Sequence, residues 1–159
     1  MPKIVALKTL NGCQLDLWLP NLNQLLSLHY HGYNKTKKQF QAVVVPLLRR
    51  QMQPVTAYPV QIEFGWYAPH RRADPDNIAG AGSKLLLDAM QVAGILANDG
   101  YKQINGLKHS FYLDPQRPHI EVQVISSPES KPLSLPKARK RVAVTEYQYQ
   151  TLSSDTEWG

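Results

Sequence analysis

Residues 60–94 read VQIEFGWYAPHRRADPDNIAGAGSKLLLDAMQVAG, and this stretch contains the two patterns that decide the fold. Its first eight residues are rich in β-branched and aromatic side chains, which is typical of a strand. Apolar residues then recur at helical spacing from about 77 to 93, and Gly94 suits the end of that helix. The stretch therefore predicts a strand, a charged connection and an amphipathic helix in succession.

Further helices and strands are indicated on both sides of this stretch. Residues 35–50 have apolar side chains at helical spacing, which predicts a second amphipathic helix that tolerates Pro46 as a kink or an early stop. The dipeptide Asn11-Gly12 favours a hairpin turn, because both residues tolerate positive φ. Residues 20–33 favour a surface loop or a short helix. Strands are expected over residues 3–8, 13–19, 103–113 and 118–125.

The order of these elements, roughly ββαβαββ, predicts an α+β fold: a single small domain with one mixed β-sheet and two main helices. The composition changes near residue 127, beyond which prolines, serines, lysines and arginines are frequent. We therefore expect a core domain over residues 1–127 and a flexible, basic Pro/Lys/Arg-rich C-terminal tail over residues 128–159. An ordered strand over residues 142–152 is the alternative for part of that tail.

The composition excludes several classes of protein. A length of 159 residues fits one domain, and 43% hydrophobic with 19% charged residues is ordinary for a globular protein. No apolar run reaches the roughly 18 residues of a membrane span, and no signal-peptide core follows Met1, so we expect a cytoplasmic protein without a membrane partner. The single cysteine, Cys13, excludes an internal disulfide, and its apolar neighbours predict a buried thiol.

The net charge of +6 is distributed unevenly along the chain. Residues 1–130 carry 13 Lys and Arg against 9 Asp and Glu, a net of +4; residues 131–141 carry five bases and no acid; residues 142–159 carry three acids and no base. Clustered bases suit a polyanionic partner such as nucleic acid, since phosphate contacts release condensed counterions. A solvated basic surface without such a partner is the alternative.

The most distinctive chemistry lies at residues 70–77, which read HRRADPDN. In an extended segment Asp74 and Asp76 project to the same side, and two carboxylates at one point suit Mg²⁺. The alternative is that this motif caps a helix, since Asp-Pro is common at a helix N-terminus. Asp99, in the sequence Asn-Asp-Gly, has the same two interpretations, because that sequence is typical of a turn.

Two features of the helix that follows also bear on the choice between a functional site and a purely structural role. Lys84 and Asp88 lie four residues apart on one helical face, and as a minimum they form an ordinary surface ion pair. Gly80 and Gly82 each lower helix stability by roughly 0.8–1.0 kcal/mol relative to alanine. Their presence near the helix start therefore indicates that another group approaches this backbone closely.

Together these motifs resemble the RusA family of Holliday junction resolvases, in particular its phage and prophage branch. The resemblance covers about residues 19–124 and depends on the order of four motifs: RR at 71–72, DPDN at 74–77, KLLLDA at 84–89 and AGILAND at 93–99. The family implies a homodimeric endodeoxyribonuclease that requires Mg²⁺, with Mn²⁺ as a substitute. Such an enzyme makes paired nicks across a four-way DNA junction in recombination and repair, here in a bacterial host cell.

Carried over to this sequence, the resemblance implies that Asp74, Asp76 and Asp99 are catalytic residues that bind the metal, and that Lys84 is the catalytic lysine. Asp88 then has a structural or supporting role. No residue has the surroundings of a covalent nucleophile, and no small-molecule cofactor is expected.

DNA binding should depend mainly on contacts with the phosphate backbone. An aromatic ring would in addition stack on an unpaired base at the crossover. The candidates are Lys35, Lys37, Lys38, Arg71 and Arg72 for phosphates, and Tyr30, Tyr33 or His29 for stacking. Paired nicking requires two active sites, so a two-fold dimer is expected, with the apolar strands at 60–67 or 118–125 as possible edges.

Three other functions compete with a junction resolvase. The first is a nuclease for other branched DNA, such as flaps or replication forks, that uses the same metal site. The second is a non-catalytic basic DNA-binding module, in which the acids are caps and turns. The third is a basic structural protein that binds no nucleic acid.

Overall fold

Strand β2 (Ala57–Ala68) is an inner strand of the four-stranded sheet in the computed structural model, which describes residues 9–132. The strand order is β1-β4-β2-β3. Strand β4 (His119–Pro132) pairs antiparallel with both β2 and β1 (Thr9–Leu15), whereas β3 (Ile104–Leu113) runs parallel to β2. The predicted α+β fold with one mixed sheet is therefore confirmed.

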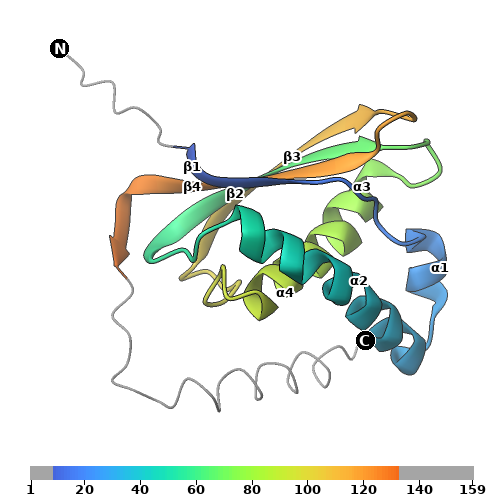
Figure 1. The fold of residues 1–159 in the computed structure, drawn as a ribbon, viewed down its shortest axis with the longest axis horizontal. Coiled ribbons are helices and arrows are strands. Elements are labelled where there is room, and N and C mark those ends of the chain that lie inside the picture. The colour runs from blue at the N-terminus through green and yellow to red at the C-terminus, as the bar shows by residue number, and fades with distance from the viewer. Residues whose placement is uncertain (1–8, 133–159) are drawn as a thin grey trace.

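The core lies between the sheet and the helices that cover one of its faces (Figure 1). Along β2 the side chains of alternate residues are buried, among them Ile62, Phe64 and Trp66, because strand side chains point to opposite faces in turn. Helices α2 (Tyr30–Gln51) and α4 (Ser83–Val92) supply the other half of this core. They are the two main helices expected from the apolar periodicity.

The connection from β2 to β3 contains three consecutive helical elements, as a crossover between parallel strands commonly does. These are α3 (Pro75–Asn77), the π-helix η1 (Ile78–Gly82) and α4. A Cβ atom on Gly82 would lie 2.7 Å from Cδ1 of Leu19 and 3.2 Å from the Trp66 ring, whereas one on Gly80 would meet nothing within 4 Å. The expected close approach is therefore found at Gly82 and not at Gly80.

The predicted hairpin turn at Asn11-Gly12 is wrong. Both residues lie inside β1, where they pair with Val124 and Gln123 of β4. The Asn11 side chain donates to the backbone oxygen of Gln53 at 2.5 Å and accepts from its backbone nitrogen at 2.9 Å. These tertiary contacts outweigh the turn preference of the dipeptide. The strand expected over residues 3–8 lies outside the described residues, and β1 ends at Leu15, earlier than residue 19.

The region before β2 is more helical than the sequence indicates. Residues 20–33 contain the short helix α1 (Leu22–Ser27) and the first turn of α2. Helix α2 continues past Pro46 to Gln51, so the proline is not an early stop. Within the described residues, no helix is both long and apolar enough to cross a lipid bilayer.

The C-terminal part of the sheet extends further than the predicted core. Strand β4 continues to Pro132, which pairs with Ala57, so the sheet includes residues 128–132 that the composition assigns to the tail. The rest of the tail lies outside the described residues. Strands β2 and β4 are both internal, so neither offers the free edge that was expected of them, and the edges of the sheet are β1 and β3.

Candidate active site

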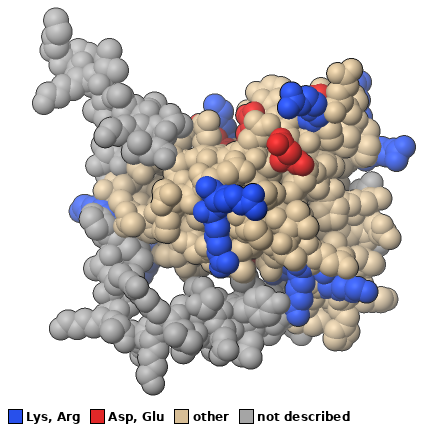
Figure 2. All heavy atoms as spheres, viewed as in Figure 1, with Lys and Arg blue, Asp and Glu red and all other residues tan. Residues whose placement is uncertain are grey.

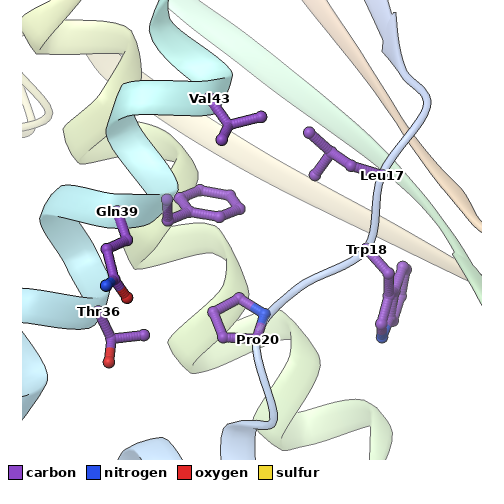
Figure 3. Close-up of a pocket in the computed structure, with 7 residues that line it drawn as sticks. Leu17, Trp18, Pro20, Thr36, Gln39 and Val43 are labelled. Atoms are coloured by element: carbon purple, nitrogen blue, oxygen red, sulfur yellow. The ribbon is translucent and has the colours of Figure 1, made fainter.

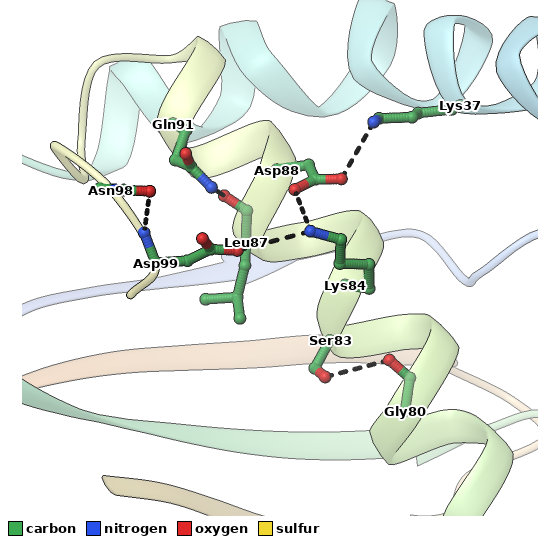
Figure 4. Close-up of polar contacts among 9 residues, drawn as sticks. All are labelled: Lys37, Gly80, Ser83, Lys84, Leu87, Asp88, Gln91, Asn98 and Asp99. Carbon is green, nitrogen blue, oxygen red and sulfur yellow. Dashed lines mark hydrogen bonds and ion pairs between the residues drawn. The ribbon is translucent and has the colours of Figure 1, made fainter. Parts of the chain in front are cut away.

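Lys84, in the first turn of α4, has its ammonium group between two carboxylates (Figure 4). Its Nζ atom lies 3.1 Å from Oδ1 of Asp88, one helical turn further on, and 3.6 Å from Oδ2 of Asp99. Asp99 follows the helix in the loop toward β3, which begins where Gly94 takes a φ of 78°. This left-handed conformation favours glycine and redirects the chain.

Asp88 is fully buried, and a second lysine from another helix neutralises it. Lys37 of α2 places Nζ 3.0 Å from Oδ2 of Asp88, and only 5% of the Lys37 side chain is exposed. The four side chains thus alternate in charge as Lys37, Asp88, Lys84 and Asp99, and they join α2, α4 and the following loop. The pair of Lys84 and Asp88 is therefore not an ordinary surface ion pair.

The protonation state of Lys84 follows from its burial and from the two neighbouring carboxylates. Burial acts to lower the pKa of Lys84, but the negative charges of Asp88 and Asp99 outweigh it, so the pKa lies above its ordinary value. Burial raises the pKa of Tyr33 to about 12, and the charge of Asp88 adds to that rise. Lys84 is consequently a cation at neutral pH, and about a third of its side chain (36%) reaches solvent.

Asp74 and Asp76 lie at the start of the helical segment and are both exposed. Asp74 occupies the N-cap position of α3, yet its side chain makes no capping hydrogen bond. Asp76 accepts a hydrogen bond at Oδ1 from the backbone nitrogen of Asn77, at 3.0 Å. Neither carboxylate forms an ion pair with a described residue. The capping interpretation of Asp74 therefore lacks the hydrogen bond that would justify it.

The expected set of three metal-binding aspartates is not assembled as a cluster. Over residues 9–132, no three His, Cys, Asp or Glu side chains lie close enough together to hold a metal ion. The chemistry of the donors nevertheless fits Mg²⁺, which prefers carboxylate oxygens and commonly binds through one or two of them while it keeps several waters. Asp74 and Asp76 offer two such carboxylates, and Asp99 is held beside Lys84.

Most of the basic residues expected to contact DNA are exposed. Lys35, Lys38, Arg71 and Arg72 reach the surface, and so does Tyr30, whose ring makes an edge contact with His31 at 5.5 Å between centroids. Figure 2 shows the face of the molecule that is turned toward the viewer in Figure 1. Lys and Arg side chains are spread over this face, while the Asp and Glu side chains lie toward its upper part.

Lys37 is the exception among the basic candidates. Its ion pair with buried Asp88 withdraws the ammonium group from solvent, so the structure does not support a phosphate contact. The sequence contains a signal for this burial, because Lys37 shares a helical face with Tyr33 and Val44, which are buried apolar residues of α2.

Sequence reasoning also missed a groove between residues 17–20 and α2. It has a volume of about 240 Å³, and the chain segment before α1 forms one wall while α2 forms the other (Figure 3). The lining side chains are Leu17, Trp18, Pro20, Thr36, Gln39, Phe40 and Val43. No local motif indicates it, because its two walls come together only in the folded chain.

Comparison of the sequence with protein-family models gives no match, and comparison with curated proteins gives none either.

Proposed function

We propose that this chain is a structure-specific endodeoxyribonuclease that resolves four-way DNA junctions, as its resemblance to the RusA resolvases implies. The observation that supports this most is Lys84, a partly exposed cation that buried Asp88 and nearby Asp99 hold in place. Ion pairs between exposed side chains contribute little to stability. The pairing of Lys84 with a fully buried carboxylate is therefore not typical of an ordinary surface lysine. A fixed cation is suited to stabilise the charge that develops on a phosphoryl group.

The remaining groups divide between binding the metal and binding the DNA. Asp74 and Asp76, with Asp99, would hold Mg²⁺, which when bound polarises the phosphate and lowers the pKa of the attacking water. Lys84 orients and neutralises the phosphate that is cut. Arg71 and Arg72, exposed in the loop before α3, bind phosphates that flank this position.

The DNA substrate is recognised mainly by charge and shape. Lys35 and Lys38 are exposed on α2 and bind the phosphate backbone, while Tyr30 stacks on an unpaired base at the crossover. Two copies of the chain supply two active sites for the two nicks, which matches the near two-fold symmetry of the junction. The enzyme would act in the cytoplasm of a bacterial host cell, on phage, prophage or host DNA.

The experiment that tests this function is a nicking assay on a synthetic four-way junction that cannot branch-migrate, with and without Mg²⁺. We expect paired, symmetric nicks that require the metal, and no cutting of a linear duplex of the same sequence. Cutting of flaps or forks at the same rate as the junction would instead identify a nuclease for branched DNA in general.

A non-catalytic DNA-binding module is the second candidate, and one observation favours it. No three carboxylate, imidazole or thiol groups are grouped for a metal over residues 9–132. A module of this kind would bind the junction with a strong salt dependence and produce no nicks at any Mg²⁺ or Mn²⁺ concentration. The nicking assay separates the two candidates.

A further inference from the structure

Strand β4 presents a histidine and a glutamate, two residues apart, on the face of the sheet that points away from the core. Ile120 and Val122 are buried in the core, so the alternation of strand side chains turns His119 and Glu121 to the opposite face. Figure 1 shows the helices of residues 9–132 on the core side of the sheet. The side chain of Glu121 is 42% exposed and that of His119 is 12% exposed, so solvent reaches both.

Two neighbours hold the imidazole ring of His119 in one orientation. The ring stacks on that of Tyr67, with 4.0 Å between the centroids and 14° between the planes. Its Nδ1 atom lies 2.6 Å from the carbonyl oxygen of Arg117. A carbonyl oxygen can only accept a hydrogen bond, so Nδ1 carries the proton and donates it. In the neutral ring, Nε2 therefore has no proton and offers a lone pair.

Tyr67 also holds the carboxylate of Glu121. The Tyr67 hydroxyl group donates to Oε2 of Glu121 at 3.4 Å. Burial and the negative charge of Glu121 raise the pKa of Tyr67, so the phenol keeps the proton that it donates. The other carboxylate oxygen, Oε1, lies 3.4 Å from Nε2 of His119. Two atoms with lone pairs thus face each other, which is unfavourable unless a proton or a metal cation lies between them.

The distance between these two atoms matches that between two ligands of a tetrahedral zinc ion. Zn²⁺ binds histidine nitrogen at about 2.0–2.1 Å and carboxylate oxygen at about 2.0–2.2 Å. At the tetrahedral angle two such ligands lie about 3.3–3.5 Å apart, and the distance from Nε2 of His119 to Oε1 of Glu121 is 3.4 Å. The octahedral angle of Mg²⁺ would bring two adjacent ligands to about 2.8–3.0 Å. The pair therefore fits zinc better than magnesium.

We propose that His119 and Glu121 form a binding site for Zn²⁺, in which Nε2 and Oε1 are the two protein ligands. Imidazole nitrogen and carboxylate oxygen are donors that zinc uses in proteins. The hydrogen bond from Nδ1 of His119 to a backbone carbonyl is the arrangement that metal-binding histidines commonly have. No third His, Cys, Asp or Glu side chain of residues 9–132 joins the pair. Water would therefore fill the other two positions of a tetrahedral site.

This zinc site does not depend on the proposed function. All residues of the candidate active site precede β3 in the chain, whereas His119 and Glu121 lie in β4. Bound zinc would stabilise the folded protein, because the unfolded chain does not hold the two ligands beside each other. The alternative is that the two side chains only share a proton as an ion pair. The two states differ in whether Zn²⁺ binds.

The test is a calorimetric titration of the full chain with Zn²⁺, in excess Mg²⁺ so that Mg²⁺ occupies sites made of carboxylates alone. We expect one Zn²⁺ per chain, and affinity at least about tenfold lower in Glu121→Gln and in His119→Phe, which keeps a ring beside Tyr67. Tyr67→Phe removes only the hydroxyl group that holds Glu121 and should cost roughly tenfold. The control His29→Gln/His31→Gln changes two exposed histidines and should bind zinc as the wild type does. A wild type that binds no zinc, or His119→Phe with wild-type affinity, would overturn the proposal.

Cobalt substitution provides a second readout that needs no variant, should His119→Phe fail to fold. In a tetrahedral site Co²⁺ absorbs visible light much more strongly than in an octahedral one. We expect strong absorption when Co²⁺ is added to the wild type, and its loss when Zn²⁺ displaces the cobalt. Zn²⁺ should also raise the unfolding temperature of the wild type and leave that of Glu121→Gln unchanged. Weak absorption of the octahedral kind, or an equal rise in both proteins, would show that His119 and Glu121 form an ion pair only.

Discussion

Lys37 of α2 and Asp88 of α4 form an ion pair of 3.0 Å in which both side chains are withdrawn from solvent. The same carboxylate holds Lys84 at 3.1 Å through its other oxygen. Asp88 therefore does two things at once: it neutralises a buried lysine in the core and fixes the direction of a lysine that reaches the surface. One side chain thus connects the contact between the two helices with the position of Lys84.

Removal of the Asp88 charge should be costly for stability. Asp88→Asn leaves Lys37 buried without its carboxylate partner, and loss of one member of a buried pair typically costs about 3–5 kcal/mol. The double variant Lys37→Met/Asp88→Leu should recover much of this loss, because it leaves neither buried charge. Urea unfolding of the three proteins measures both effects. A double variant no more stable than Asp88→Asn would contradict the assignment of this loss to an unpaired buried charge.

The same double variant should not recover activity. Lys84 would keep only Asp99, at 3.6 Å, as its carboxylate partner, so its ammonium group would be less well oriented. We expect a nicking rate on the four-way junction well below that of the wild type, with junction affinity little changed. A fully active double variant would remove Asp88 from the positioning of Lys84.

The two glycines near the helix start should respond in opposite ways to the same change. Gly82→Ala places a methyl group 2.7 Å from Leu19 and against the Trp66 ring, and overpacking of this kind typically costs about 1–3 kcal/mol. Gly80→Ala meets nothing within 4 Å and should be neutral or stabilising by roughly 0.5–1 kcal/mol. Thermal unfolding distinguishes them; equal effects from the two substitutions would contradict the packing described for Gly82.

Acid should destabilise the protein through His109. Burial lowers the pKa of this ring in the folded state below the value of 6.5 that it regains on unfolding. Just below pH 6.5 the unfolded chain therefore binds more protons than the folded chain does. Above that pH, His109 takes nothing from the free energy of unfolding; as the pH falls below it, the free energy of unfolding decreases.

His109→Gln tests this cause directly. The amide oxygen of glutamine can still accept the hydrogen bond of Trp66, but the side chain does not titrate. The decline in unfolding temperature between pH 7.5 and pH 5.5 should become shallower in this variant. An equally steep decline in His109→Gln would assign the acid sensitivity to other groups.

The basic tail should contribute affinity for DNA and not cleavage chemistry. A chain that ends after Pro132 keeps the whole of β4 and loses Lys137, Arg139, Lys140 and Arg141. We expect weaker junction binding with a shallower salt dependence, since fewer phosphate contacts release fewer counterions. At saturating protein the nicking rate should be retained, and its complete loss would place catalytic groups in the tail.

Periodicity was enough to predict the elements that carry the site. The strand at 60–67 and the helix at 77–93 have regular patterns of apolar residues, and both are present within β2 and the segment from α3 to α4. The turn at Asn11-Gly12 was mispredicted because the contacts that hold these residues in a strand are made with residues distant in sequence. Pairing with β4 and two hydrogen bonds to Gln53 hold those residues in a strand, and no local pattern reports them.

The site itself was only partly predictable for the same reason. The spacing of Lys84 and Asp88 indicates a contact, because residues four apart on a helix are neighbours. Their burial depends on Lys37, which belongs to another helix, and a lysine is ordinarily assigned to the surface. The approach of Asp99 to Lys84 depends on how the loop after Gly94 folds back, which the sequence does not specify locally.

The nicking rate of Asp76→Asn on an immobile four-way junction in Mg²⁺ tests the proposed function most directly. Asparagine keeps the size of the side chain, and its Oδ1 atom can still accept the hydrogen bond from the backbone of Asn77, so the fold should survive. It replaces a charged oxygen ligand with a neutral one, which is a poor ligand for Mg²⁺. Lys84→Ala, which removes the cation and no metal ligand, is the companion variant.

We expect the Asp76→Asn rate to fall by orders of magnitude relative to the wild type, at an unchanged unfolding temperature and with junction affinity equal or higher, since removal of an acid reduces repulsion of phosphate. An Asp76→Asn protein that nicks the junction at nearly the wild-type rate would contradict the catalytic role of this motif.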